Sequence, residues 1–338
     1  MITRELERVK AGIHLSTEEM ERVAHYFFDE SSDLQVMEEM LRALYNKGEV
    51  AEEMASMAHV MRSHAVEFPS EATYFDNCGT GGDGANTFNI STTSAFVLAS
   101  LGVQVMKHGN RKISSESGST DVLEALGIPF QMTVEQHIEM ADHANVSFLH
   151  APNVHPRLKR IGEVRSRIEH ATLFNLIGPF TNPSPVGAQL IGVGRPQLLM
   201  EYAKAMQILG LQGLVITNDV GLDEAALTGQ NKLVFVTEEA IVPYVFRATQ
   251  FGLQEAPLEA IRGGDGTYNA RITERILQNE QSPHRDTVVL NVGLGLLATG
   301  VVQSVEDGIA LAHEAIRSGR AYEALERARS FRVKEVAR

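Results

Sequence analysis

Four polar segments between Asp76 and Thr120 are rich in glycine or in hydroxyl side chains. They read Gly79-Thr80-Gly81-Gly82-Asp83-Gly84, Asn89-Ile90-Ser91-Thr92, Lys107-His108-Gly109-Asn110-Arg111 and Ser114-Ser115-Glu116-Ser117-Gly118-Ser119. Because glycine has no Cβ, backbone N–H groups beside it can approach an anion closely. Serine or threonine at the start of a helix adds hydroxyl donors beside the positive end of the helix dipole. The four segments therefore predict a site for a phosphorylated ligand.

Two other phosphate-binding motifs do not fit this region. Gly79, Gly81 and Gly84 have the spacing of a dinucleotide-binding loop, but that loop needs an acidic residue about 20 positions later. No Asp or Glu occurs between Gly84 and Glu116, and no Gly-Lys-Ser or Gly-Lys-Thr of a P-loop follows the glycines. The glycine cluster is followed instead by residues 89–99, which have the pattern of a capped entry into an apolar helix.

Composition and charge limit the classes of partner. The chain has 338 residues, of which 43% are hydrophobic, enough for a substantial core in one large domain or in two unequal ones. Its formal net charge of −13 repels nucleic acid and anionic lipid over most of the surface, so we expect neither a nucleic-acid nor a membrane partner. Basic side chains cluster within residues 107–112 and 157–167, where they could attract a phosphorylated substrate locally.

Cysteine content and apolar runs bear on the compartment. The single cysteine, Cys78, excludes an intramolecular disulfide and indicates a reducing environment. The first eight residues alternate in charge, and the longest apolar run, residues 288–302, is interrupted by Asn291 and glycines. These patterns predict no signal peptide and no membrane span, and we expect a cytoplasmic location.

The expected elements would place the polar segments at one edge of a sheet. Residues 1–68 predict helices beginning after Ser16, after Asp33 and near Val50. Beyond Pro69, strands are expected at residues 73–76, 103–106, 146–149, 189–193, 214–217 and 232–236, alternating with helices as in an α/β domain with a mostly parallel central sheet. Ligands of such sheets bind at the carboxyl ends of the strands, where the glycine loop and the Lys107 segment would both lie. Residues 263–266 are expected to form a surface turn.

In the four segments the chain resembles the anthranilate phosphoribosyltransferases of tryptophan biosynthesis, and the likeness continues in order over nearly the whole chain. The resemblance implies an enzyme that joins C1 of phosphoribosyl pyrophosphate to the amine of anthranilate, with Mg²⁺, and releases pyrophosphate. It also implies a fold of the nucleoside phosphorylase and phosphoribosyltransferase type. A small helical domain, residues 1–70 joined by helices near 165–190, would be hinged to a large α/β domain, residues 71–164 and 191–338. A homodimer through the helical domain is implied as well.

The resemblance further assigns binding roles to individual residues, and none of them acts as an acid, a base or a nucleophile. For phosphoribosyl pyrophosphate it implies Gly79, Gly82, Asp83, Thr87, Asn89, Ile90, Ser91, Thr92, Lys107, His108, Gly109, Asn110, Arg111, Lys112, Ile113, Ser114, Ser115 and Ser119. For anthranilate it implies Gly79, Asn110, Arg165, His108, His155, Gly178 and Pro179, and for the metal Ser91, Asp223 and Glu224.

Local chemistry agrees with these roles but leaves alternatives open. The Arg165 guanidinium could bind a carboxylate through two parallel hydrogen bonds. Asp223 and Glu224 follow a predicted strand, and Mg²⁺ prefers one or two carboxylates together with substrate oxygens and water. Adjacent carboxylates on a loop are, however, commonly only solvated. His108 and His155 are either pocket walls or buried histidines with satisfied ring nitrogens.

Two departures from the family pattern concern turnover and the acceptor. Glu116 stands where the family usually has Lys or Arg, and Ile168-Glu169-His170-Ala171-Thr172 replaces a segment that usually reads Leu-Gly-x-Arg-Thr. The alternatives to a transferase are a pyrimidine nucleoside phosphorylase of similar architecture and a non-catalytic homologue that binds a phosphorylated ligand. The intact Asp223-Glu224 pair and the negative net charge favour the transferase.

Overall fold

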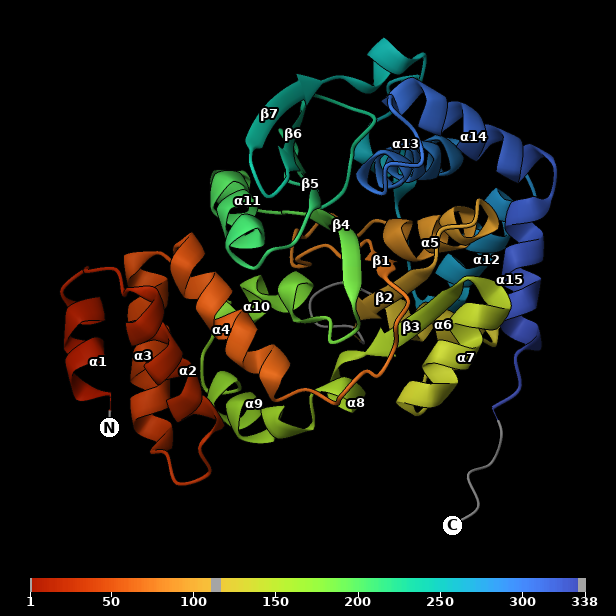
Figure 1. Cartoon of the computed structure of the whole chain (residues 1–338). Helices are drawn as coiled ribbons and strands as arrows, with labels where there is room; N and C mark the ends of the chain where they lie inside the picture. Colours follow the sequence, from red (N-terminus) through yellow and green to blue (C-terminus); the bar gives the residue numbers. More distant parts are fainter. Residues whose placement is uncertain (1, 111–116, 334–338) are drawn as a thin grey trace.

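The computed structural model describes residues 2–110 and 117–333. In Figure 1 a group of N-terminal helices lies beside a larger part built around a twisted sheet. Within the described residues, no helix has both the length and the apolar character that crossing a bilayer would need.

The N-terminal helices begin and end where their sequences supply caps. The Ser16 and Glu19 side chains form a capping box, and Asp33 accepts a hydrogen bond from the first turn of the next helix. Gly48, with φ of +86°, ends that helix. The predictions of helices after Ser16, after Asp33 and near Val50 are confirmed. The four helices are α1 (Thr3–Lys10), α2 (Thr17–Phe28), α3 (Leu34–Lys47) and α4 (Ala51–Ser63).

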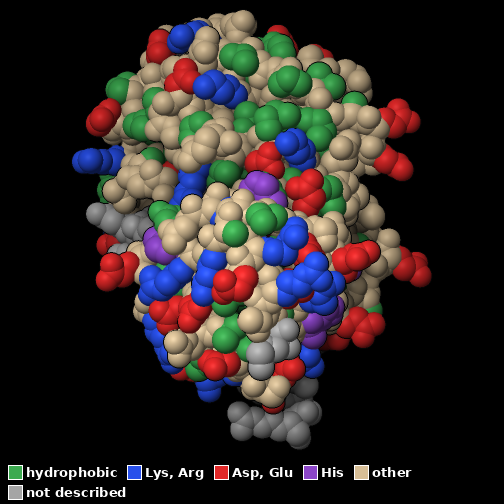
Figure 2. Space-filling model, turned by 90° about the vertical axis from the view of Figure 1, so that its left-hand side faces the viewer, with side chains coloured by type: hydrophobic (Ala, Val, Ile, Leu, Met, Phe, Trp, Pro, Cys, Tyr) green, Lys and Arg blue, Asp and Glu red, His purple; other side chains and the backbone are tan. Residues whose placement is uncertain are grey.

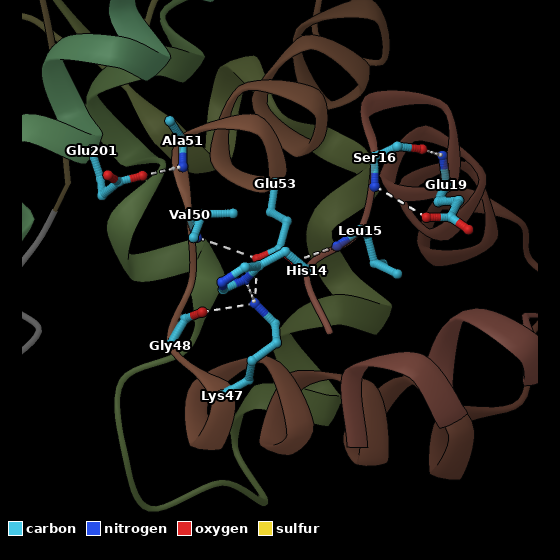
Figure 3. Close-up of polar contacts among 10 residues, drawn as sticks. All are labelled: His14, Leu15, Ser16, Glu19, Lys47, Gly48, Val50, Ala51, Glu53 and Glu201. Carbon is cyan, nitrogen blue, oxygen red and sulfur yellow. Dashed lines mark hydrogen bonds and ion pairs between the residues drawn. The ribbon is translucent and has the colours of Figure 1, made fainter. Parts of the chain in front are cut away.

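One buried carboxylate holds the connections of this helical bundle together (Figure 3). Glu53 forms an ion pair with Lys47 at 2.8 Å, and their side chains are 0% and 2% exposed. Its other oxygen accepts the Leu15 N–H at 3.0 Å, and the paired oxygen also accepts the Val50 N–H at 3.2 Å. The Lys47 ammonium in addition lies 2.8 Å from Nδ1 of His14. Glu53 thus fixes the α1–α2 connection, the end of α3 and the start of α4 at once.

The sheet has seven strands in the order β3-β2-β1-β4-β5-β6-β7. The first five strands pair in parallel, and β6 and β7 add an antiparallel edge, so the prediction of a mostly parallel sheet is confirmed. The strand β7 was not predicted; Pro243 interrupts its pattern, which an edge strand tolerates. The strands are β1 (Tyr74–Asp76), β2 (Val105–Gly109), β3 (Val146–His150), β4 (Val186–Gly192), β5 (Gly213–Asn218), β6 (Asn231–Val236) and β7 (Ile241–Phe246).

Both faces of the sheet are buried, because neighbouring strand residues point into two different cores. Leu190 and Leu214 belong to one hydrophobic cluster, whereas Ile191 and Val215 belong to the other. The first cluster is covered by α5 (Ile90–Ser100), α6 (Ser119–Leu126), α7 (Val134–Ala144), α12 (Gly266–Leu277), α13 (Pro283–Ala298), α14 (Val305–Arg317) and α15 (Arg320–Ser330). The second contains side chains of the bundle and of α9 (Lys159–Arg165), α10 (Leu173–Leu176), η2 (Gly178–Thr181) and α11 (Leu199–Ile208).

The bundle is joined to the sheet part through α11. Glu201 of α11 accepts the Ala51 N–H at 2.8 Å, which satisfies one of the free donors at the start of α4 (Figure 3). Figure 2 shows the bundle side of the molecule, with acidic and basic side chains intermixed over its lower half and hydrophobic ones gathered higher up, toward α11 and β7. Exposed apolar side chains of these two elements include Ile208 and Tyr244.

The prediction of a simple surface turn at residues 263–266 is wrong. Asp265 caps α12, and its Oδ1 accepts the Tyr268 N–H at 2.8 Å. Gly263 donates its N–H to the Asn86 carbonyl at 2.9 Å, and Asn269 of α12 donates to Oδ1 of Asn89 at 2.8 Å. The segment therefore supports the loop that leads into α5.

We predict that Glu53→Gln destabilises the protein by about 3 kcal/mol, because the amide leaves the Lys47 ammonium buried without a counter-charge. Urea unfolding at neutral pH measures the change. Glu314→Gln, at the exposed pair with Arg317, is the matched control and should stay within about 0.5 kcal/mol of the parent protein. Equal unfolding midpoints for the Glu53 variant and the parent would show that the network contributes no stability.

Candidate functional site

A cleft of about 870 Å³ opens between the carboxyl ends of the parallel strands and the helical side of the molecule. Its walls come from the glycine loop after β1, the end of β2, the loop after β5, α9 and α10, and Met61 of α4. The predicted site residues that line it are Gly79, Gly82, Asp83, Thr87, Asn89, Ser91, Thr92, Lys107, His108, Gly109, Asn110, Ser119, Arg165, Gly178, Asp223 and Glu224.

Other predicted site residues do not line this cleft. Ile90 packs in the first hydrophobic core, and Pro179 is buried with its carbonyl accepting a hydrogen bond from Gln189 at 2.9 Å. His155 is buried behind His108, with the ring centroids 5.5 Å apart. Arg111, Lys112, Ile113, Ser114 and Ser115 lie outside the described residues, as does the departure at Glu116.

The glycine loop packs directly against Asp223. Gly81 donates its N–H to Oδ2 of Asp223 at 2.6 Å, and Gly81, Gly82 and Gly84 all have positive φ angles, from +67° to +72°. A Cβ on Gly79 would come within 2.3 Å of the same Asp223 oxygen. The position of the Asp223 carboxylate therefore requires glycine at residue 79. The glycines of the loop would also let an anion approach the backbone closely.

Hydroxyl groups lie in the first turn of α5, next to the acidic pair and the glycine loop. Ser91 and Thr92 occupy the first turn and line the cleft. The Asn89 side chain does not cap this helix, since its Oδ1 is bonded to Asn269. Oγ1 of Thr92 is buried with no hydrogen-bond partner among the described residues. The helix start is thus arranged as a donor surface for an anion.

The end of β2 supplies a buried cation and a neutral imidazole. The Lys107 ammonium donates to the Asn77 carbonyl at 3.2 Å, and its side chain is nearly inaccessible. Burial lowers the pKa of His108 to about 3, and His155 and Lys107 beside it add to the shift. His108 therefore carries no charge at neutral pH. It could contact a substrate without competing with an arginine for the substrate carboxylate.

Asp223 and Glu224 form a half-buried acidic pair after β5. Burial raises the pKa of Asp223 to about 7, and the neighbouring Asp83 adds to the shift. Burial and the Asp223 charge raise the pKa of Glu224 well above its usual range. Lys107 opposes both shifts without cancelling them. A cation bound beside the pair would offset both the burial and the repulsion.

The residues around the pair fit a small divalent cation. A cavity of about 10 Å³ is bounded by Asn77, Ser91, Asp223 and Glu224, among others, and such a volume holds roughly one water-sized group. Within residues 2–110 and 117–333 no cluster of three or more His, Cys, Asp or Glu side chains could hold a metal. Asp223 and Glu224 could hold Mg²⁺ only together with substrate oxygens and water, which supply most of its ligands in many proteins.

Two asparagines that hold the acidic loop were missed by the sequence analysis. Asn218 at the end of β5 donates to the Leu222 and Glu224 carbonyls at 2.9 and 2.7 Å. Asn291 of α13 accepts the Ala225 N–H at 2.9 Å and donates to the Ala225 carbonyl at 3.0 Å. A polar residue inside the longest apolar run was the available signal for Asn291.

Arg165 lies at the end of α9 on the helical side of the cleft. It is half-buried, no described residue forms an ion pair or hydrogen bond with its guanidinium, and burial lowers its pKa. A desolvated guanidinium gains from an anionic partner, which a bound carboxylate would supply.

Residues 168–172, whose sequence departs from the family pattern, also line the cleft. The His170 ring stacks on Tyr45 of α3, with centroids 3.7 Å apart, and Arg42 of the same helix donates to the Arg167 carbonyl at 2.8 Å. The structure therefore fastens this rim of the cleft to the bundle.

Known proteins match both parts of the chain. Profiles of the glycosyl transferase family match residues 71–322 with its a/b domain and residues 4–65 with its helical bundle domain. An anthranilate phosphoribosyltransferase of Exiguobacterium sibiricum is 45% identical over 323 residues, which are 95% of each chain. The chain belongs to the anthranilate phosphoribosyltransferase family. Family membership favours the transferase over the nucleoside phosphorylase and the non-catalytic homologue. The two profile matches also confirm the predicted fold class of a helical part and an α/β part.

Solved anthranilate phosphoribosyltransferases have the same fold. The crystal structure of the Thermus thermophilus enzyme superimposes with a TM-score of 0.91 at 38% identity, covering 96% of this chain and 98% of that one. The Saccharomyces cerevisiae enzyme in complex with phosphoribosyl pyrophosphate and Mg gives a TM-score of 0.86 at 26% identity, covering 96% of each chain.

We predict that Gly79→Ala lowers phosphoribosyltransferase activity roughly tenfold or more, because the new Cβ displaces the Asp223 carboxylate by van der Waals overlap. Gly84→Ala is the matched control: its Cβ would meet open space, and it adds only backbone strain of about 1 kcal/mol. Initial rates and melting temperatures of both variants test the prediction, which fails if the Gly79 variant retains the activity of the Gly84 variant.

Proposed function

We propose that this cleft transfers the phosphoribosyl group of phosphoribosyl pyrophosphate to the amine of anthranilate with the help of Mg²⁺. The observation that carries the proposal is the meeting of three features in one cleft: the donor surface at the start of α5, the acidic pair, and the desolvated guanidinium of Arg165. Family membership and the yeast relative in complex with phosphoribosyl pyrophosphate and Mg support it.

The residues divide the substrate between the two sides of the cleft. On the sheet side, the glycine loop, Ser91, Thr92 and Lys107 would bind phosphate and pyrophosphate oxygens. On the helical side, Arg165 would hold the anthranilate carboxylate and so direct the amine toward C1 of the ribose. The bond from C1 to the pyrophosphate oxygen breaks, the bond from C1 to nitrogen forms, and the amine loses one proton.

The chain supplies positioning and charge for this displacement. Ser91, Asp223 and Glu224 would hold Mg²⁺, which supplies positive charge to the departing pyrophosphate when it is bound. Lys107 and the backbone N–H groups of the glycine loop would stabilise the same negative charge. His108 and Gly178 would line the acceptor pocket, together with the backbone of Asn110. The role of residues 111–115 in binding the donor remains part of the same proposal.

We also propose that residues 165–190 join residues 1–70 in a helical domain and that this domain forms a homodimer. Leu173 and Phe174 share a hydrophobic cluster with the side chains of α2, α3 and α4, which supports the first proposal. Ile13 and Tyr45 are 45% and 38% exposed on the bundle, which supports the second. A cytoplasmic location agrees with the biosynthetic activity and with the lone Cys78.

We predict that replacing Asp223 by Asn together with Glu224 by Gln lowers the rate of anthranilate consumption roughly a hundredfold and raises the Mg²⁺ concentration required. The loss of anthranilate fluorescence across a Mg²⁺ titration measures both quantities. Asp219→Asn, which changes an exposed carboxylate of the same loop that is paired with Lys232, is the matched control and should behave as the parent. Superimposable Mg²⁺ curves for the double variant and the control would remove the acidic pair from the mechanism.

We predict that Arg165→Ala raises the KM for anthranilate roughly tenfold to a hundredfold, the effect of losing a hydrogen bond to a charged group. The KM for phosphoribosyl pyrophosphate should hardly change. Arg62→Ala removes another arginine whose pKa is lowered by burial but which does not line the cleft, so it controls for lost packing. The assignment is contradicted if both variants shift the acceptor constant equally.

A further inference from the structure

Asp76 is a buried carboxylate to which the proposed mechanism gives no role. It is the last residue of β1, is 0% exposed, and does not line the cleft. Burial raises the pKa of Asp76 to about 6, whereas Lys107 and its hydrogen-bond donors oppose the shift. The side chain is therefore mostly ionised at neutral pH, although burying a charge is costly.

The Asp76 carboxylate bonds to both sides of the acceptor pocket. Its Oδ1 accepts the backbone N–H of His108 at 3.2 Å, and its Oδ2 accepts from Nδ2 of Asn182 at 2.9 Å. Asn182 also donates to the Met106 carbonyl at 2.8 Å. The amide of Asn182 thus connects the segment after η2 to β2. Asp76 accepts hydrogen bonds from both of these segments.

A second bridge strengthens the same connection from β4. Gln189 is buried, donates to the Pro179 carbonyl at 2.9 Å, and also forms a hydrogen bond with Asp76. The ring of His108 in turn lies beside the backbone of Gly178. His108 and Gly178 both line the cleft, one from each of the two segments that Asp76 connects.

We propose that Asp76 is a positioning residue that fixes His108 and the Gly178–Thr181 turn relative to each other and thereby shapes the anthranilate pocket. The inference rests on the proposed function of the cleft. An apolar replacement would leave two buried donors without an acceptor, and even asparagine fails, because its amide must turn its own NH₂ toward either the His108 N–H or the Asn182 NH₂.

The test compares Asp76→Asn with Glu53→Gln, which neutralises an equally buried carboxylate of the bundle that does not line the cleft. We expect Asp76→Asn to raise the KM for anthranilate roughly tenfold, the consequence of one buried donor left unmet, and to change the KM for phosphoribosyl pyrophosphate by a clearly smaller factor, through the loss of the charge that faces Lys107. Glu53→Gln should lower the melting temperature but leave both constants unchanged.

Asn182→Ala is an independent test, since it keeps the Asp76 carboxylate and removes the amide that links the segment after η2 to Asp76 and to Met106, together with the two hydrogen bonds that the amide accepts from Ser184. It should raise the acceptor constant in the same direction, and the double variant of Asp76 and Asn182 should be less impaired than the product of the single effects. If Asp76→Asn does not fold, the Asn182 variant decides alone.

The inference is overturned if the acceptor constant stays within about twofold of the parent value or if donor and acceptor constants rise equally. Absence of anthranilate consumption by the unaltered protein would instead refute the proposed function itself. The two failures are therefore distinguishable.

Discussion

The site depends on keeping two neighbouring carboxylates half-buried against a loop of glycines. Burial disfavours ionisation of both Asp223 and Glu224, and the charge of Asp83 on Asp223 and that of Asp223 on Glu224 add to the effect, so a nearby positive charge stabilises the ionised pair. The Lys107 ammonium supplies only part of this stabilisation. The same packing explains the glycine loop, because Gly79 has no room for a Cβ and Gly81 donates its N–H to the Asp223 carboxylate. The phosphate-binding loop and the acidic pair, far apart in the sequence, are therefore one structural constraint.

A reaction without an acid, a base or a nucleophile from the protein relies on accurate placement of charges. The structure achieves this placement with buried asparagine amides that each bridge separate backbone segments. Asn218 and Asn291 hold the loop of the acidic pair, and Asn182 holds the turn after η2 to β2. Since an amide both donates and accepts, one side chain can satisfy two backbone groups that would otherwise be buried without partners.

The sequence predicts those parts of the molecule whose signals are local. Caps at Ser16 and Asp33 and the alternation of strands with helices identify the bundle and the parallel sheet, and the order of motifs identifies most of the residues that line the cleft. The missed parts depend on partners that are distant in the chain. Asp265 caps α12, but the glycines around it resemble a surface turn in the sequence. Pro243 interrupts the strand pattern of β7 at the edge of the sheet. The sequence gives no sign that Asp76 has its partners on two other segments.

The two sides of the cleft are held by different parts of the molecule, and this bears on the departures from the family pattern. The proposed donor-binding residues follow the strands of the sheet, whereas residues 167–172, which come directly after α9 and Arg165, are fastened to the bundle through Arg42 and the stacking of His170 on Tyr45. Replacements within residues 168–172 consequently alter the wall that carries the proposed carboxylate-binding guanidinium and leave the glycine loop untouched. If donor and acceptor contact different walls, as proposed, a change confined to one wall affects one substrate first. We therefore expect this departure to act on the choice and orientation of the acceptor rather than on the binding of the phosphoribosyl donor.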